Sequence, residues 1–106
     1  MISFEYFKKL DIRIGKIETA ERIPDSDKLL RLEVNIGDEK RQIVAGIAEF
    51  YEPEQLIGRE VPILANLEPR MLRGVESQGM LLAADANGEP VLFSPDKDIP
   101  PGSIVK

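Results

Sequence analysis

The chain has 106 residues, of which 42% are hydrophobic and 31% are charged, so it can build one core but not two. It has no cysteine and no histidine, which excludes disulfides, thiolate or imidazole metal sites and any mechanism that needs a histidine base. A formal net charge of −5 opposes phosphate binding over the chain as a whole, although a basic stripe can lie on an acidic protein.

The sequence carries no sign of a membrane or export segment. No apolar run approaches the ~20 residues that a membrane span needs. Residues 1–5 lack the basic and then apolar order of a signal peptide. We therefore expect a cytoplasmic protein with no membrane partner, no cofactor and no metal. Carboxylates remain for acid–base chemistry, but enzymatic activity of the isolated chain is disfavoured.

The first predicted element is a short helix over residues 4–10. Ser3 is a suitable N-cap, an acidic residue follows in the first turn, and two lysines lie toward the C-terminal end. Phe4, Phe7 and Leu10 share one face of this helix. We expect that face to dock on the core, with a role in a subunit interface as the alternative.

A long, bent first strand is predicted next. Residues 11–14 alternate between apolar and polar, and residues 16–18 alternate in the opposite phase. Gly15 lies at the change of phase, which predicts a β-bulge there. A strand bent in this way is what a small closed barrel requires. A turn-rich loop over residues 22–28 follows.

The second strand is the clearest half-buried strand of the chain. Its inward positions are predicted to be Leu30, Leu32, Val34 and Ile36. After a turn over residues 37–40, residues 42–45 return as the third strand. Residues 48–58 then contain a proline and a terminal glycine, which favour one or two short helical turns.

The second half of the chain is predicted to close the barrel. Residues 61–64 form a fourth strand, in which Pro62 favours an edge or rim position. A polar loop over residues 66–79 precedes a buried fifth strand over residues 80–84. Asn87 and the glycine after it form a hairpin signature, and a short strand and a proline-rich tail end the chain.

Five short strands, with a helical turn between the third and the fourth, predict an all-β protein. The expected fold is a five-stranded Greek-key OB-fold barrel with a short N-terminal helix and a C-terminal extension. We expect residues 1–106 to form a single domain, with the helix and barrel in residues 1–85. Residues 86–106 would form the extension.

Three blocks of sequence carry a family resemblance. They are Asp-Ile-Arg-Ile-Gly-Lys-Ile at residues 11–17, Pro-Asp-Ser-Asp-Lys-Leu at residues 24–29, and residues 66–80, which begin Asn-Leu-Glu-Pro-Arg and end Gly-Val-Glu-Ser-Gln-Gly-Met. Residues 41–47 form a fourth, weaker block. The chain resembles the tRNA-binding OB domain found as the C-terminal module, or separate beta subunit, of methionyl-tRNA synthetases. It departs from the family at Ile23, where histidine is frequent, and at Met71, where a second basic residue is frequent.

This resemblance implies a non-catalytic module that binds tRNA and assists aminoacylation, alone or beside a separate catalytic synthetase subunit. It also implies a homodimer formed by the segment from about residue 86 onward. The apolar candidates for that interface are Val91, Leu92, Phe93, Ile99, Ile104 and Val105. The alternative is that the tail folds back on its own barrel.

OB barrels bind nucleic acid across the face of their second and third strands, between flanking loops. Here the candidate phosphate or base contacts are Lys28, Arg31, Arg70 and Arg73, with Asn66 and Ser77 against a base edge and Met80 against a base face. Each also has a plainer interpretation, as a solvated cation, a turn cap or core filler. With aromatic residues at 6%, we expect binding to depend on cations and shape more than on stacking.

Two functions from other classes remain open. The first is a homodimeric peptide-binding export chaperone like CsaA, a family that shares the fold and an Asp-Ile-Arg opening and binds extended polypeptide. An acidic surface would suit basic peptides, but the block at residues 66–80 favours tRNA. The second is a purely structural dimerisation module, which would bind neither.

Overall fold

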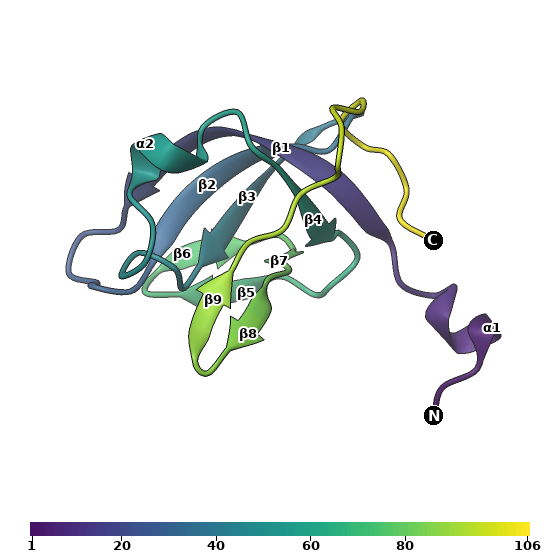
Figure 1. Cartoon of the computed structure of the whole chain (residues 1–106). Coiled ribbons are helices and arrows are strands. Elements are labelled where there is room, and N and C mark those ends of the chain that lie inside the picture. Colours follow the sequence, from purple (N-terminus) through teal and green to yellow (C-terminus); the bar gives the residue numbers. More distant parts are fainter.

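The computed structural model, which describes all 106 residues, is built around one antiparallel sheet that curls into a nearly closed barrel (Figure 1). The sheet has the strand order β3-β2-β1-β4-β7, and two small hairpins, β5–β6 and β8–β9, are attached to it. The elements are α1 (Phe4–Phe7), β1 (Ile12–Arg22), β2 (Leu30–Asn35), β3 (Lys40–Ala45), α2 (Pro53–Leu56), β4 (Glu60–Leu64), β5 (Arg70–Leu72), β6 (Val75–Ser77), β7 (Met80–Leu81), β8 (Ala84–Ala86) and β9 (Glu89–Val91). The predicted all-β, OB-type barrel is confirmed.

The core follows from the alternation of the strands. All four inward positions predicted for the second strand are buried, which confirms that part of the sequence pattern. Side chains from β1, β3 and β4 meet them inside the barrel, including Ile17, Ile43 and Ile63, each 0% exposed. Leu56 of α2 is also fully buried and joins this cluster, so the short helix covers part of the core.

β1 is one continuous strand, and its irregularity does not lie at Gly15. Gly15 pairs regularly with Val61 of β4, whereas the register against β2 shifts between Ile17 and Thr19. The predicted bulge position was therefore wrong by a few residues. Gly15 is needed for a different reason: a Cβ there would lie 2.4 Å from a methyl group of Val34, so the glycine permits close packing.

β4 is an interior strand, so of the two positions predicted from Pro62, an edge or a rim, the edge was wrong. Pro62 is buried, and β4 has hydrogen-bonded neighbours on both sides, β1 and β7. The missing N–H is tolerated because the ladder with β7 contains only two residue pairs. The Pro62 carbonyl oxygen still accepts a hydrogen bond from the Leu82 N–H at 3.0 Å.

The segment predicted as a polar loop before the last barrel strand folds as the β5–β6 hairpin. Its turn places Arg73 at φ 51° and Gly74 at φ 78°. The strand predicted for residues 80–84 was too long: β7 contains only Met80 and Leu81, and Ala84 already begins the next hairpin. The predicted Asn-Gly turn is confirmed there, with Asn87 at φ 56°.

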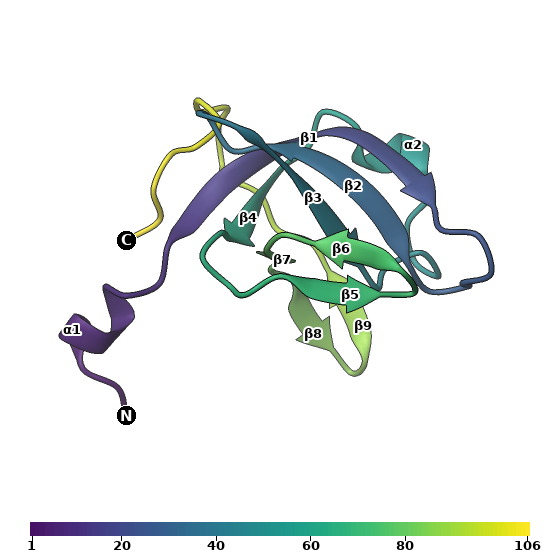
Figure 2. The same ribbon diagram turned by 180° about the vertical axis from the view of Figure 1, so that it is seen from behind.

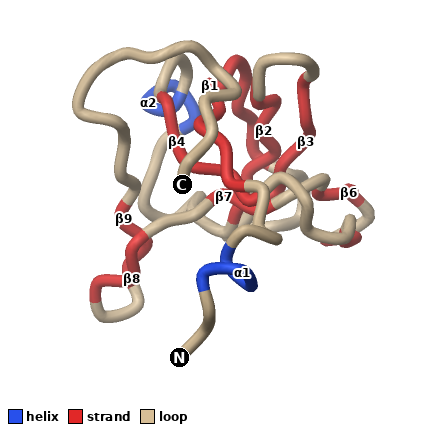
Figure 3. Tube along the Cα trace, turned by 90° about the vertical axis from the view of Figure 1, so that its right-hand side faces the viewer, coloured by secondary structure: helices blue, strands red, loops and turns tan.

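The two ends of the chain leave apolar surface exposed. The Ser3 side chain caps α1 as predicted, at 3.1 Å from the Tyr6 N–H, but α1 buries none of its residues. Figures 1 and 3 show this helix standing away from the barrel, so its expected docking on the core was wrong.

No helix of the structure has the length and apolarity to cross a membrane.

The C-terminal tail runs back along β1. The Ile14 N–H donates to the Ser103 carbonyl oxygen at 2.9 Å, and the Val105 N–H donates to the Ile12 carbonyl oxygen at 2.8 Å. Of the expected interface residues, Leu92 is buried in the chain's own core and Ile99 is half-buried. The remaining four, Val91, Phe93, Ile104 and Val105, are exposed.

Candidate nucleic-acid interface

Side chains at the end of β6 and directly after it close the barrel against the outer edge of β3. The Gln78 N–H donates to the Gln42 carbonyl oxygen at 2.7 Å, and the Gln78 side-chain oxygen accepts from the Gln42 N–H at 3.0 Å. The Ser77 hydroxyl accepts from the Val44 N–H at 3.0 Å and donates to the Gly79 carbonyl oxygen at 2.9 Å. Two side chains thus replace the ladder hydrogen bonds that a full strand would supply.

This role explains the Ser-Gln-Gly sequence at residues 77–79. Ser77 is only 4% exposed, and its hydroxyl both donates and accepts within the chain. Gly79 has φ 133°, and a Cβ there would lie 2.9 Å from the Leu64 carbonyl oxygen. The structure therefore places Ser77 in the barrel wall, with its hydroxyl engaged within the chain.

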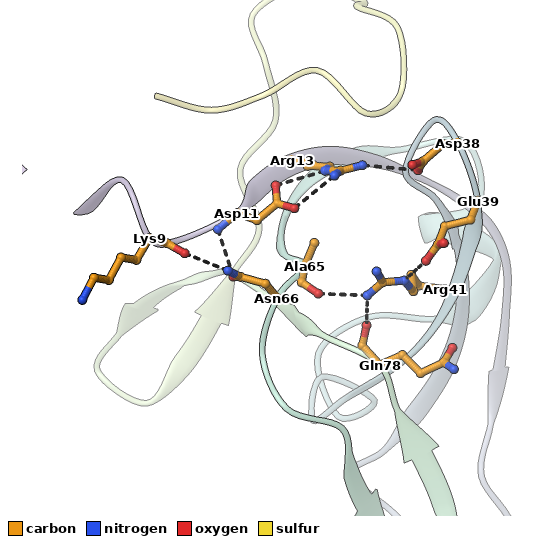
Figure 4. Close-up of polar contacts among 9 residues, drawn as sticks. All are labelled: Lys9, Asp11, Arg13, Asp38, Glu39, Arg41, Ala65, Asn66 and Gln78. Carbon is orange, nitrogen blue, oxygen red and sulfur yellow. Dashed lines mark hydrogen bonds and ion pairs between the residues drawn. The ribbon is translucent and has the colours of Figure 1, made fainter. Parts of the chain in front are cut away.

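Arg41 holds both ends of the segment that carries the β5–β6 hairpin (Figure 4). Its Nη1 donates to the Ala65 carbonyl oxygen at 2.9 Å and to the Gln78 carbonyl oxygen at 3.0 Å, and its Nε is paired with the Glu39 carboxylate. Sequence reasoning missed this residue. The sequence did carry one indication: Arg41 is two residues before the buried Ile43 on β3, so both side chains project from the same face of the strand.

Asn66 has a similar bracing role at the start of the same segment. Its Oδ1 accepts from the Asp11 N–H at 2.9 Å, and its Nδ2 donates to the Lys9 carbonyl oxygen at 2.7 Å. Figure 4 shows the amide between these two partners. Asp11 also binds Arg13 through both carboxylate oxygens, which raises the pKa of the Arg13 guanidinium. Asn66 is exposed, but its amide is already used to join the hairpin segment to the start of β1.

A cavity of about 480 Å³ lies on the outer face of β1, β2 and β3, and we call it the polar groove. Only one of its nine lining residues is hydrophobic. Its three cations all have carboxylate partners: Arg31 is paired with Glu21, Lys40 with Glu18 and Arg41 with Glu39. Hydrogen bonding between Lys40 and Glu18, at 2.9 Å, lowers the pKa of the glutamate and raises that of the lysine.

Three other predicted cations form no ion pair: Lys28 in the β1–β2 loop, Arg70 at the start of β5 and Arg73 in the hairpin turn. We call these residues of the loop and the hairpin the loop cations. The Arg73 guanidinium donates to the Asp25 carbonyl oxygen at 3.4 Å, so the hairpin turn meets the β1–β2 loop that carries Lys28. Figure 2 shows the hairpin extending toward that loop across the end of β3. All three loop cations are exposed, and Met80 is 41% exposed.

This arrangement combines a polar groove on the β1–β2–β3 face with a loop and a hairpin that carry unpaired cations. It defines an OB-fold module of the class that binds single-stranded or folded nucleic acid. Cations placed on the β1–β2 loop and the β5–β6 hairpin leave the face of the main sheet free for contacts with bases.

The family model described as "Putative tRNA binding domain" matches residues 12–104, and the chain belongs to this family. The Methionine--tRNA ligase of Methanothrix thermoacetophila is 63% identical over 106 residues, which is 100% of this chain and 16% of that relative. The chain thus spans about a sixth of the length of this curated relative. The resemblance stated from the three sequence blocks is confirmed.

Two solved structures share the whole fold. The MetRS related protein from Pyrococcus horikoshii superposes with a TM-score of 0.95 at 36% identity, covering 100% of this chain and 98% of that one. The chaperone CsaA from Bacillus anthracis gives a TM-score of 0.90 at 33% identity, covering 100% and 99%.

Proposed function

We propose that the chain is a non-catalytic tRNA-binding module that increases the local concentration of tRNA for a methionyl-tRNA synthetase. The observation that carries the proposal is that three exposed cations without carboxylate partners lie on the β1–β2 loop and the β5–β6 hairpin, which Arg73 joins, in a barrel of the tRNA-binding family. Unpaired cations are free to displace counterions from phosphates, which is the main source of affinity for nucleic acid. This explains how an acidic chain can bind RNA.

The predicted site residues divide into two roles under this proposal. Lys28, Arg70 and Arg73 contact phosphates, and Arg31 contributes less because Glu21 already neutralises it. Met80 lies exposed near the hairpin and offers its thioether to a base face. Asn66 and Ser77 hold the hairpin segment in place instead of reading a base edge.

We further propose that the chain forms a homodimer through the tail side of the barrel. Phe93 is 51% exposed and Ile104 is 59% exposed, and both line a mainly apolar cavity of about 280 Å³ with Ile14 and Pro62. Apolar surface of this kind on a small barrel is a typical interaction site. A second copy would cover it and leave the polar groove on the β1–β3 face open.

The experiment that tests the tRNA proposal compares single-cation variants of the full chain. Arg73→Ala and Lys28→Ala should each weaken tRNA binding several-fold and reduce the slope of log affinity against log salt by roughly one unit per contact. Lys97→Ala removes an exposed cation from the tail and is the matched control. The tRNA affinity of this variant should equal that of the unaltered chain.

The same titration also tests the chaperone alternative, which is supported by the structural similarity to CsaA. An unfolded protein is added as competitor at matched salt. Displacement of tRNA by the unfolded protein, together with unchanged binding by both cation variants, would contradict the tRNA proposal.

A further inference from the structure

Glu33 lies at the centre of the polar groove. The strand registers place Thr19 of β1 directly beside it on one side and Gln42 of β3 on the other. Opposed residues of antiparallel strands project from the same face with Cβ atoms about 5 Å apart, so the three side chains form a row of about 10 Å. All three line the same cavity.

The Glu33 carboxylate is the one charged group of the groove without a partner. It is exposed and forms neither an ion pair nor a side-chain hydrogen bond, while each of the groove's cations is paired with another carboxylate. The negative charge of Glu33 contributes to the raised pKa of Lys40, but the Lys40 ammonium is paired with the Glu18 carboxylate at 2.9 Å. The groove therefore presents an unpaired group that only accepts hydrogen bonds.

The negative charge of Glu33 affects the phosphates and the bases of an RNA ligand differently. A carboxylate repels phosphate, so the RNA backbone is expected to follow the loop cations and not the centre of the groove. A base that enters the groove must offer donors to Glu33. Guanine has two adjacent donors on its Watson–Crick edge, N1–H and the N2 amine, and these match the two oxygens of a carboxylate. Adenine and cytosine place an acceptor beside their amine, and uracil has one N–H between two carbonyl groups.

We propose that Glu33 is a specificity-determining residue that selects an unpaired guanine in the polar groove, a proposal that rests on the tRNA-binding function above. The Thr19 hydroxyl has no hydrogen bond within the chain and supplies a donor for guanine O6. Gln42 already donates through its side-chain nitrogen to the Glu76 carbonyl oxygen at 2.8 Å, which leaves its side-chain oxygen to accept from the N2 amine.

The test uses the full chain and short fluorescent oligouridylates that carry one central guanine, inosine or uracil, at a single low salt concentration. The unaltered chain should bind the guanine oligomer about tenfold more tightly than the uracil oligomer, with inosine between them because it lacks the N2 amine. Glu33→Gln should reduce the guanine-to-uracil ratio to within about twofold and leave uracil binding equal or tighter. Glu89→Gln, an exposed carboxylate of β9, is the matched control and should keep the full preference.

Several results would overturn the assignment. Equal binding of the three oligomers by the unaltered chain, or a ratio that Glu33→Gln leaves unchanged, would show that Glu33 only sets the local charge. A lysine-rich peptide that binds more tightly than the guanine oligomer, and loses affinity in Glu33→Gln, would make the groove a peptide site. If the unaltered chain binds tRNA but shows no preference for guanine, only the guanine proposal is refuted. If the unaltered chain binds no RNA at all, the proposed function is refuted as well.

Discussion

Replacing Ser77 by alanine should destabilise the barrel without removing a contact to RNA. The hydroxyl joins the end of β6 to β3: it accepts from the Val44 N–H at 3.0 Å and donates to the Gly79 carbonyl oxygen at 2.9 Å. Ser77 is 4% exposed and the Val44 residue is 8% exposed, so water cannot readily replace the lost partner. The variant leaves a buried N–H without an acceptor.

The expected cost follows from that unsatisfied group. Leaving a buried donor unpaired costs about 1–3 kcal/mol, and the Gly79 carbonyl oxygen loses a donor as well, so we expect a loss of about 2 kcal/mol in the free energy of unfolding. For a domain of this size, such a change lowers the melting temperature by roughly 10 °C.

Urea denaturation of the full chain measures the free energy, and a tRNA titration well below the melting temperature measures binding. Ser94→Ala serves as the control because Ser94 is exposed and makes no side-chain hydrogen bond. Unchanged stability combined with a tenfold loss of tRNA affinity would refute the reasoning and return Ser77 to the binding surface.

Three further predictions follow from named contacts. Arg41→Met should lower the free energy of unfolding by about 2 kcal/mol and weaken tRNA binding without changing its salt slope, because Arg41 positions the hairpin and does not touch phosphate. Lys40→Met should raise the Glu18 pKa in an NMR titration; the pair stabilises the fold above the ordinary glutamate pKa, and that contribution is lost as the pH falls through the lowered folded value. A Glu18 pKa that stays low would mean that Lys40 is not its cause. Phe93→Ser should shift the chain from dimer to monomer in sedimentation while tRNA binding per chain stays within about threefold, and an unchanged dimer would exclude this face.

The barrel itself was predictable because its strands obey simple alternation. The inward run of β2, the Asn-Gly turn and the Ser3 cap are local patterns, and the structure confirms them. Gly15 and Pro62 were misread because their roles depend on neighbours distant in sequence: the side chain of Val34 for the glycine, and a two-pair ladder for the proline.

The candidate site was harder to predict, because polar side chains suit ligands and barrel closure equally well. Asn66 and Ser77 stand in the segment that resembles the tRNA-binding family, yet both bind backbone groups of their own chain. The Val44 N–H bound by Ser77 and both partners of Asn66 are 33 to 57 residues away in sequence, so no local pattern could reveal these contacts. Arg41 was missed for the same reason, and its inward parity was the only local sign.

We propose that three unpaired loop cations let an acidic barrel bind tRNA. A titration of the purified chain with tRNA at two salt concentrations, with single-stranded DNA and an unfolded protein as competitors, tests this most directly. Three phosphate contacts predict that affinity falls about 30-fold between about 50 mM and about 200 mM salt, with tRNA preferred over both competitors. Absence of tRNA binding at low salt, or preference for the unfolded protein, would contradict the account.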